Sequence, residues 1–359
     1  MGSAHEVSTS RPGSSQQPNK TAMSTVRAVV AFAERCGLSL EEIAEELGVR
    51  VRTLHGFDGM VPDDRPARFM KRLEASGKDP ALTLHIAERT PFSYFGGIER
   101  AAYYAPTVRA AMDTFLDFAW ILSARLGSFV DESESYVAYH FPHPMGHLDN
   151  GMFREIAVAM FWKLIRESIG TKGGLAEISL GYTPNGQIDR YRAYFDTRVT
   201  FGVFPGDHVL VFSKDVLETA NVHANPVLYR LGIRYLDEQV RLRNRQGFST
   251  EHSSLRRAVG KAIRHGDYSV AGVARNLDLS VRSAQRLALG CGVTLREMIG
   301  ENRIDLAKCM IADDPDISLG DLTEKLGYRD QSSFRRAFVR FSGVGVANFR
   351  RAFRSPSDT

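Results

Sequence analysis

Two stretches near the end of the chain repeat one pattern of apolar and polar positions. In the later stretch the apolar positions recur at helical spacing, pause and recur again; they are Leu319, Leu322 and Leu326, then Phe334, Phe338 and Phe341. Ser318 and Asp330 precede the two runs, where short polar side chains cap helices. Gly327 falls in the pause, where a tight turn needs a left-handed residue. The pattern predicts two short helices joined by a turn.

The earlier stretch, residues 268–287, shows the same order of features. Its apolar positions are Val270, Val273, Ala274, Leu277 and Leu279. Ser269 and Ser280 stand where the two helix caps are expected. The second helix then continues into a stretch poor in charge, where Gly290 weakens a helix by about 1 kcal/mol relative to Ala. We therefore predict a second helical pair that is less regular than the later one.

The second helix of each pair carries polar side chains beside its apolar stripe. They are Arg282, Gln285 and Arg286 in the earlier pair, and Gln331, Ser332, Ser333, Arg335, Arg336 and Arg340 in the later pair. Such a helix fits the major groove of DNA, about 12 Å wide, where Arg suits guanine and Gln suits adenine. The tandem arrangement predicts binding to double-stranded DNA. The alternatives are a helical hairpin with a solvated polar face and, for the earlier pair, contact with the DNA backbone alone.

A connecting helix is expected between the two pairs, from Thr294 to Ala312. Thr294 and Glu297 form a capping box at its start, and Asp313-Asp-Pro315 ends it. At 1.5 Å per residue the helix is about 28 Å long. Successive major grooves on one face of a duplex lie about 34 Å apart, so a helix of this length suits two recognition helices placed one turn apart.

These segments resemble the DNA-binding domain of the AraC/XylS family of bacterial transcription regulators, over residues 255–353. The matching pieces are Ser280–Arg286, Arg303–Ala307, Gly327–Phe338, Phe341–Val344 and Phe349–Arg350. The resemblance implies an all-α domain, RNA polymerase as a partner, and base contacts by the residues at matching positions, which are Arg282, Gln285, Arg286, Gln331, Ser332, Ser333 and Arg336. The chain departs from the family at Thr323, usually Ala, at Gly345-Val346, usually Ser-Pro or Pro-Pro, and at Leu287–Leu289, usually more basic.

Charge is distributed unevenly along a chain of ordinary composition. The 359 residues are 43% hydrophobic and 25% charged, with a net charge of +4. Residues 250–354 hold 18 Lys and Arg against 12 Asp and Glu, whereas residues 1–249 hold 28 against 29. The basic surplus therefore belongs to the segment expected to meet phosphate.

Before residue 250 the pattern changes to long apolar helices mixed with short strands. Residues 24–90 are expected to be helical, and two longer apolar helices are expected over 106–126 and 151–169. Alternating or β-rich runs predict strands at 135–141, 176–182, 192–195 and 208–212. These elements predict an α+β domain, residues 24–224, with a small and mostly antiparallel sheet covered on one face.

Residues 39–54 imitate a third helix-turn-helix. Its first helix is acidic, with Glu41, Glu42, Glu45 and Glu46, and would repel phosphate. We therefore expect this pair to pack inside the domain.

The α+β part resembles the arabinose-binding-type N-terminal domain of a branch of the AraC family related to ornithine-utilisation and virulence regulators. The resemblance covers residues 60–225 and rests on Phe95–Glu99, Thr107–Ala111, Val199–Phe201 and Leu217–Ala220. It implies a sensor for a small-molecule effector, and nothing in the residues points to arabinose itself.

Aromatic side chains are abundant in this half and are candidates for an apolar effector pocket. The candidate ligand-binding residues are Tyr94, Phe95, Tyr103, Phe118, Trp120, Tyr139 and Trp162. Most of the aromatic residues are also explained as filling of the core. His140, His143 and His147 lie close in sequence, but two prolines and the lack of a nearby Cys favour a polar loop over a metal site, and no cofactor is expected.

The two parts are joined by residues 225–252, where an amphipathic helix from Pro226 to Val240 precedes a linker from Gly247 to His252. We expect this helix either to make the contact of a homodimer, through Leu231 and Leu236, or to pack on its own domain. The DNA-binding domain then spans 253–354, a tail spans 355–359, and residues 1–23 are expected to be disordered.

Three further features narrow the function. The cysteines Cys36, Cys291 and Cys309 are odd in number and suit a reducing cytoplasm. No apolar run approaches the roughly 18 residues of a membrane span, and no catalytic motif is recognisable. We expect an effector-controlled transcription regulator and not an enzyme; the alternatives are an enzyme with a DNA-binding tail and a ligand-independent DNA-binding protein whose N-terminal domain dimerises or binds a protein partner.

Overall fold

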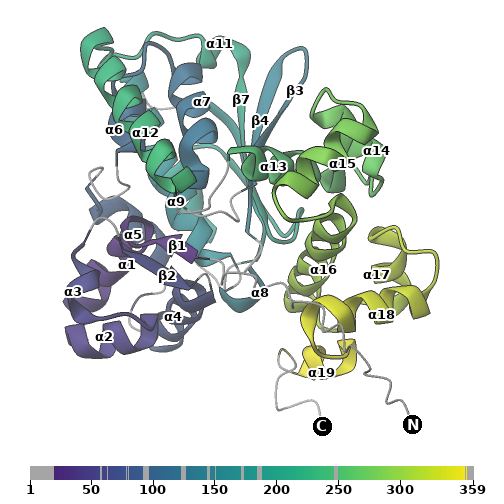
Figure 1. Cartoon of the computed structure of the whole chain (residues 1–359). Helices are drawn as coiled ribbons and strands as arrows, with labels where there is room; N and C mark the ends of the chain where they lie inside the picture. The colour runs from purple at the N-terminus through teal and green to yellow at the C-terminus, as the bar shows by residue number, and fades with distance from the viewer. Residues whose placement is uncertain are drawn as a thin grey trace, which may run out of the picture.

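The chain folds into an α+β part followed by an all-helical part (Figure 1). The computed structural model describes residues 20–56, 59–62, 64–77, 79, 81–91, 97–122, 127–143, 146–149, 151–170, 174–183, 188–245, 250–351 and 353. No helix in these ranges has both the length and the apolar character needed to cross a membrane.

The N-terminal region is a layer of short helices: α1 (Met23–Arg35), α2 (Leu40–Leu47), α3 (Val51–Leu54), α4 (Asp64–Ala75) and α5 (Leu82–Arg89). Strands β1 (Lys20–Ala22) and β2 (Met60–Pro62) form an antiparallel pair. Residues 20–22, which were expected to be disordered, are therefore a strand. The acidic helix α2 starts at a capping box of Ser39 and Glu42 and buries Ile43, Ala44 and Leu47. The following α3 has only four residues, and the motif packs in the core as predicted.

A five-stranded sheet forms the centre of the α+β part, in the order β3-β4-β7-β5-β6. The strands are β3 (Phe129–Glu132), β4 (Tyr136–Pro142), β5 (Leu175–Leu180), β6 (Arg198–Phe201) and β7 (Asp207–Ser213). All neighbouring pairs are antiparallel except β5 and β6. The helices around it are α6 (Ile98–Tyr103), α7 (Val108–Phe118) with the 3-10 turn η2 (Ala119–Ile121), α8 (Gly146–Asp149), α9 (Met152–Ile169), α10 (Ile188–Phe195) and α11 (Lys214–Leu217).

One of the four expected strands is wrong, and two strands of the five-stranded sheet were missed. Residues 192–195 are not a strand: they end the helix α10, which places Tyr191, Tyr194 and Phe195 in the core at helical spacing. The edge strands β3 and β6 were not expected. The helix expected over 106–126 is α7 and the short turn η2, and residues 123–126 lie outside the described residues.

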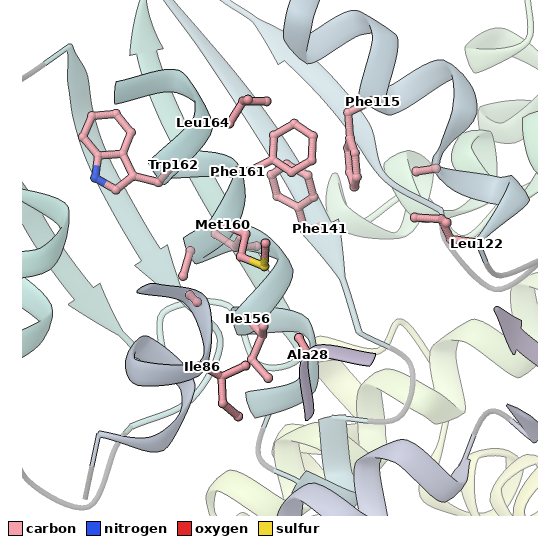
Figure 2. Packing of buried hydrophobic residues seen from close by; sticks show 14 of the residues in the cluster. Ala28, Ile86, Phe115, Leu122, Phe141, Ile156, Met160, Phe161, Trp162 and Leu164 are labelled. Carbon is pink, nitrogen blue, oxygen red and sulfur yellow. The ribbon is translucent and has the colours of Figure 1, made fainter. Parts of the chain in front are cut away.

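One face of the sheet packs against α7 and α9 to form the main hydrophobic core. Val137, Tyr139 and Phe141 of β4 alternate onto this face. Figure 2 shows Phe115 of α7 and Phe161 of α9 meeting over Phe141, and the ring centroids of Phe115 and Phe161 are 3.8 Å apart.

The opposite face of the sheet is covered at its β3-β4-β7 end, which corrects the expectation of a sheet covered on one face. The strand register places Asp131, Ala138 and Asp207 on this face with His140. Helix α13 (Thr250–Arg264), the first helix after residues 246–249, packs there against β3 (Figure 1). Because α13 starts at Thr250, residues 250–252 of the expected linker are helical.

The all-helical part contains two small hydrophobic cores. It comprises α13, α14 (Val270–Asn276), α15 (Val281–Gly290), α16 (Leu295–Asp313), α17 (Leu319–Lys325), α18 (Gln331–Ser342) and α19 (Val346–Arg351). Helix α12 (Pro226–Arg245) precedes it and packs against α6 of the α+β part. One core lies between α13, α14, α15 and the start of α16, and the other between the end of α16, α17, α18 and α19. The connecting helix α16 starts at the capping box of Thr294 and Glu297, as predicted.

Candidate nucleic-acid interface

Helices α14 and α15 form the first helix-turn-helix, which we call the first reading head (residues 269–290). The Ser269 hydroxyl accepts a hydrogen bond from the Gly272 N–H at 3.0 Å, and Ser280 caps α15 in the same way at Ser283. The turn between the helices passes through Asp278, which adopts a φ of 55°. Asp tolerates the left-handed region better than most residues, because its short polar side chain can bond locally.

Helices α17 and α18 form the second reading head (residues 318–342). Ser318 caps α17 by accepting from the Asp321 N–H at 2.9 Å, and Asp330 caps α18 by accepting from the Ser333 N–H at 2.7 Å. Gly327 occupies the turn with a φ of 64°, as its position predicted. The local capping chemistry therefore produces the expected helix-turn-helix in both heads.

The two recognition helices, α15 and α18, present matching faces to solvent. The exposed polar residues are Arg282, Gln285 and Arg286 on α15, and Gln331, Ser332, Arg335, Arg336 and Arg340 on α18. Ser333 is half-buried, and its N–H donates to Asp330 in the cap of α18. The guanidinium of Arg336 donates to the hydroxyls of Ser332 and Ser333 at 3.1 and 3.2 Å. These contacts place Arg336 on the same side as the two serines.

Arg340 stands apart from the other candidates. Its guanidinium lies 3.7 Å from a carboxylate oxygen of Glu297 at the start of α16, and both side chains are exposed. An exposed ion pair of this kind is weak, so DNA phosphate can compete for Arg340.

The predicted effector residues are divided between the core and a half-buried rim. Trp120, Tyr139 and Trp162 are buried, and the Trp162 indole N–H donates to the Tyr194 carbonyl at 3.3 Å. Burial raises the pKa of Tyr139, whose hydroxyl has no hydrogen-bond partner among the described residues. Tyr103 and Phe118 are half-buried, and Tyr103 stacks on His223 with centroids 4.4 Å apart. Tyr94 and Phe95 lie outside the described residues.

A cavity that the sequence did not reveal lies between α1, α2, α4 and α5. Its volume is about 310 Å³, and its lining is Phe32, Cys36, Gly37, Leu38, Glu42, Arg72, Leu73, Ser76, Asp79 and Leu82. The volume is at the lower end of the range, about 300–1,000 Å³, that small-molecule sites occupy. No pattern in residues 32–82 marks this cavity, because its walls come from four separate helices.

A buried carboxylate is a second feature that sequence reasoning missed. Glu155 of α9 is fully buried, where it accepts hydrogen bonds from Thr83 at 2.5 Å and from the hydroxyl of Tyr182, which also contacts Tyr191. Burial raises its pKa to about 7, and the hydroxyl contacts limit the rise. The signal was an acidic residue inside the apolar run of α9.

The three histidines in the region 140–147 occupy separate sites. His140 Nδ1 lies 2.9 Å from Asp207, and His143 Nε2 lies 3.1 Å from Asp149. His147 lies beside Phe349 with centroids 5.7 Å apart, and burial lowers its pKa to about 4. The described residues contain no group of His, Cys, Asp and Glu side chains placed to hold a metal ion.

Charged side chains join the sheet to the all-helical part. Asp131 on β3 lies 3.0 Å from the Lys261 ammonium and 2.7 Å from His265 Nε2, which follows α13. Asp207 on β7 lies 3.6 Å from the Arg264 guanidinium. His140 lies between these two carboxylates. Because Lys261 and Arg264 belong to the helix whose other side fills the core of the first reading head, the sheet and that head share one element.

A second contact between the two parts lies at α16. The Cys309 thiol is buried against α8 and lies 3.8 Å from the His143 carbonyl oxygen. A Cβ added at Gly206 would lie 3.0 Å from the Cys309 Cβ, so the backbone before β7 approaches α16 closely. Burial raises the pKa of Cys309 to about 12.

Comparison with known proteins agrees with this architecture. Residues 37–221, just over half of the chain, match the family described as the arabinose-binding domain of AraC transcription regulator, N-term. Residues 273–352 match a helix-turn-helix domain family. No curated protein matches the chain.

A crystal structure of the transcriptional regulator CdpR from Pseudomonas aeruginosa is similar at 20% sequence identity and a TM-score of 0.40, over 89% of this chain and 98% of that chain. A similarity of this size carries no conclusion of its own. The two family matches and the tandem helix-turn-helix do carry one: the chain belongs to the AraC family of transcription regulators and is a DNA-binding regulator, not an enzyme.

Proposed function

We propose that the chain is a sequence-specific transcription regulator, and that a small molecule bound in residues 24–224 controls its affinity for operator DNA. The observation that carries this proposal is the shared sheet. One face holds the sensor core, and the other holds α13 through Asp131 and Asp207. A ligand that shifts the strands changes the position of α13, and therefore of the first reading head, relative to the sensor. An effect on transcription then requires different affinities for two such arrangements.

Direct reading of DNA by both heads is the second part of the proposal. The exposed faces of α15 and α18 support it, because they combine guanidinium and amide groups on one side of each helix. We assign base contacts to Arg282, Gln285 and Arg286 in the first head and to Gln331, Ser332, Ser333 and Arg336 in the second. Arg335 and Arg340 are assigned to phosphates.

The effector site is proposed within the N-terminal part. The half-buried Tyr103 and Phe118, with the buried Trp120, Tyr139 and Trp162, remain the aromatic candidates. The cavity beside Cys36 and Arg72 is the alternative location, and its mixed apolar and charged lining suits a small amphipathic molecule.

A homodimer through α12 is the third part. Leu228, Leu231, Tyr235 and Leu242 are exposed at intervals of three, four and seven residues, the spacing of a coiled-coil seam. Leu231 is 54% exposed, whereas Leu236 is only 1% exposed and packs into the sensor core. Leu236 is therefore removed from the expected contact, because a substitution there would damage the domain itself.

The dimer has a direct test in sedimentation equilibrium of the full chain. Leu231→Glu is expected to shift the protein to monomer, because a charge would be buried in the seam. Val222→Glu is the control, since Val222 is exposed just before α12 and outside the seam. A dimer that survives Leu231→Glu would remove α12 from the interface.

The effector proposal has a test that separates it from ligand-independent DNA binding. Operators are first selected from random duplex DNA with the full chain, and small molecules are screened for a rise in thermal stability. A ligand at 100 times its dissociation constant stabilises by about 2.7 kcal/mol. An effector must also change the affinity for the selected operator. If binding compounds leave that affinity unchanged, the N-terminal part serves assembly alone.

A matched pair of variants tests the route through the sheet. Asp131→Asn removes the charge that faces Lys261 and His265, and should reduce the effect of the ligand on operator affinity. Glu132→Gln is the control, because Glu132 pairs with Lys214 and Arg109 inside the sensor. Equal coupling in both variants would exclude the β3 contact as the route.

A further inference from the structure

The two reading heads have separate hydrophobic cores, so something other than a common core must fix their relative position. Helix α16 contributes Leu295, Met298 and Ile299 to the first core and Ile304 and Ala307 to the second. Leu306 packs against both cores. A single helix that joins two small cores leaves each head free to tilt as the helix bends, unless a direct contact joins the heads.

Such a contact is formed by Tyr268, Arg303 and Tyr328, which we call the head joint. Tyr268 precedes the first helix of the first head, Arg303 is on α16, and Tyr328 is in the turn of the second head. The Arg303 guanidinium carbon lies 3.6 Å from the ring centroid of Tyr328 and 4.6 Å from that of Tyr268. These distances are typical of cation–π contacts, and all three side chains are partly buried.

The head joint also occupies the carboxyl end of α17. The last carbonyls of a helix have no partner within the helix. Here the Tyr268 hydroxyl donates to the Lys325 carbonyl, and the Arg303 Nε donates to the Leu326 carbonyl at 2.8 Å. A cation at this end is also favoured by the helix dipole. The end of the first helix of the second head is therefore held by Arg303 of α16 and by a residue that leads into the first head.

The turn of the second head is shaped to accept this contact. A Cβ added at Gly327 would overlap the Tyr268 ring, so glycine is required there for close approach as well as for its positive φ. On α16 itself, three residues before Arg303, a Cβ on Gly300 would lie 2.6 Å from the Phe341 ring of α18. The first of these close approaches restricts sliding between the heads, and the second restricts sliding of α18 along α16.

From these contacts we propose that Arg303, with Tyr268 and Tyr328, fixes the separation and angle of α15 and α18 and thereby determines which spacing between two base-pair boxes the regulator accepts. Arg303 is a positioning residue, because it acts through the two heads and is not one of the exposed side chains of the recognition helices. The proposal rests on the proposed reading of DNA by both heads.

The test measures how affinity depends on the spacing of the two boxes. Duplexes selected from random DNA by the full chain define the two boxes, and a series then adds or removes one base pair between them. One base pair moves a box by roughly 3.4 Å and turns it by roughly 35°. The wild type should lose about 10-fold in affinity for each single change, the size of one mismatched pair.

Two variants weaken the head joint without a large change in volume. Arg303→Met removes the guanidinium, and Tyr268→Phe removes only the hydroxyl. Both should flatten the spacing profile, to within about 3-fold across the series for Arg303→Met, while affinity for a duplex with one box stays near that of the wild type. Arg329→Met is the matched control, because Arg329 is exposed beside the joint and takes no part in it; its profile should keep the wild-type shape.

The outcomes are distinct. A flattened profile with retained single-box affinity supports the proposal. A profile of unchanged shape in both Arg303→Met and Tyr268→Phe overturns it while leaving the proposed function intact. If the wild type selects only single-box duplexes, both the two-head reading and the head joint's role are overturned. Should Arg303→Met unfold on heating well below the wild type, Tyr268→Phe alone decides between the first two outcomes.

Discussion

The recognition helices of the two reading heads share one pattern of exposed and buried positions, but they pack on different cores. Positions of α15 and α18 that are 50 residues apart have the same burial throughout the first ten residues of each helix. The buried positions are Ala284 and Ala288 in the first head and Phe334 and Phe338 in the second. Helix α15 therefore packs closely through small side chains, and α18 through large rings. The recognition surface depends on the spacing of the positions, and not on the size of the side chains beneath it.

The exposed residues differ in chemistry at matched positions. Arg286 matches Arg336, and Arg282 matches Ser332. Gln285 and Gly290 match Arg335 and Arg340. Leu289 matches the exposed Val339, whereas the exposed Val281 matches Gln331 and so adds an apolar position to α15. The recognition helix α18 therefore carries three arginines against two on α15. Helix α15 has one more exposed apolar residue, which suits contact with a thymine methyl group.

The largest effect should come from the cores. Phe338→Ala is expected to lower the stability of the second head by about 3–5 kcal/mol, because it opens a cavity under α18. Ala288→Gly in the first head should cost only about 1 kcal/mol, through helix propensity. Chemical denaturation of the full chain, followed by far-UV circular dichroism, measures both. Equal losses of stability in the two variants would contradict the conclusion that the two heads have different kinds of core.

The next effect concerns base contact by matched arginines. Arg336→Ala should cost about 1–3 kcal/mol on the selected operator and relax preference at one position. Arg286→Ala should do the same if the first head also reads bases. Binding is measured on the operator and on its single-base variants. A uniform loss on all sequences would make the arginine concerned a phosphate contact.

The two turns give a smaller contrast. Gly327→Ala should cost about 1–2 kcal/mol from the left-handed backbone alone, with a further loss from overlap with Tyr268. Asp278→Gly should change stability by less than about 1 kcal/mol, because relief of strain is offset by added freedom of the unfolded chain. Thermal unfolding of the two variants ranks them. A larger loss for Asp278→Gly would mean that the Asp side chain has a role beyond the turn.

The smallest effect is a gain. Gly290 is exposed near the end of α15, and an added Cβ would meet nothing within 4 Å. Gly290→Ala should therefore stabilise the first head by about 0.5–1 kcal/mol. Arg340→Ala, at the matched position of α18, should be nearly neutral for stability and should weaken DNA binding at low salt. No gain from Gly290→Ala would indicate that the end of α15 is already frayed.

The sequence predicted the features that depend on local chemistry. Caps at Ser318, Asp330 and Thr294 bond to N–H groups three residues away, so residue type and spacing are sufficient to find them. The same holds for the glycine turn at residue 327. The helix α10 was mistaken for a strand because aromatic residues favour strands, although Tyr191 and Tyr194 are spaced for one face of a helix.

Contacts between distant residues could not be predicted. The pairing of Asp131 with Lys261 joins positions 130 residues apart, and nothing in either segment records it. The apolar positions of α12 showed an amphipathic helix, but they did not show that Leu236 faces the sensor and Leu231 faces solvent. The three residues of the head joint are similarly dispersed, at positions 268, 303 and 328.

The contact between α13 and β3 has a consequence for solubility. Strand β3 is an edge of the sheet, and an open edge is a template for pairing with other chains. The Lys261 ammonium donates to the Val130 carbonyl at 3.0 Å, so the helix occupies a backbone acceptor of that edge strand. A fragment cut before α13 would expose this strand to edge-to-edge aggregation. We therefore expect the sensor to be more soluble when it is expressed together with α13 than when it is expressed alone.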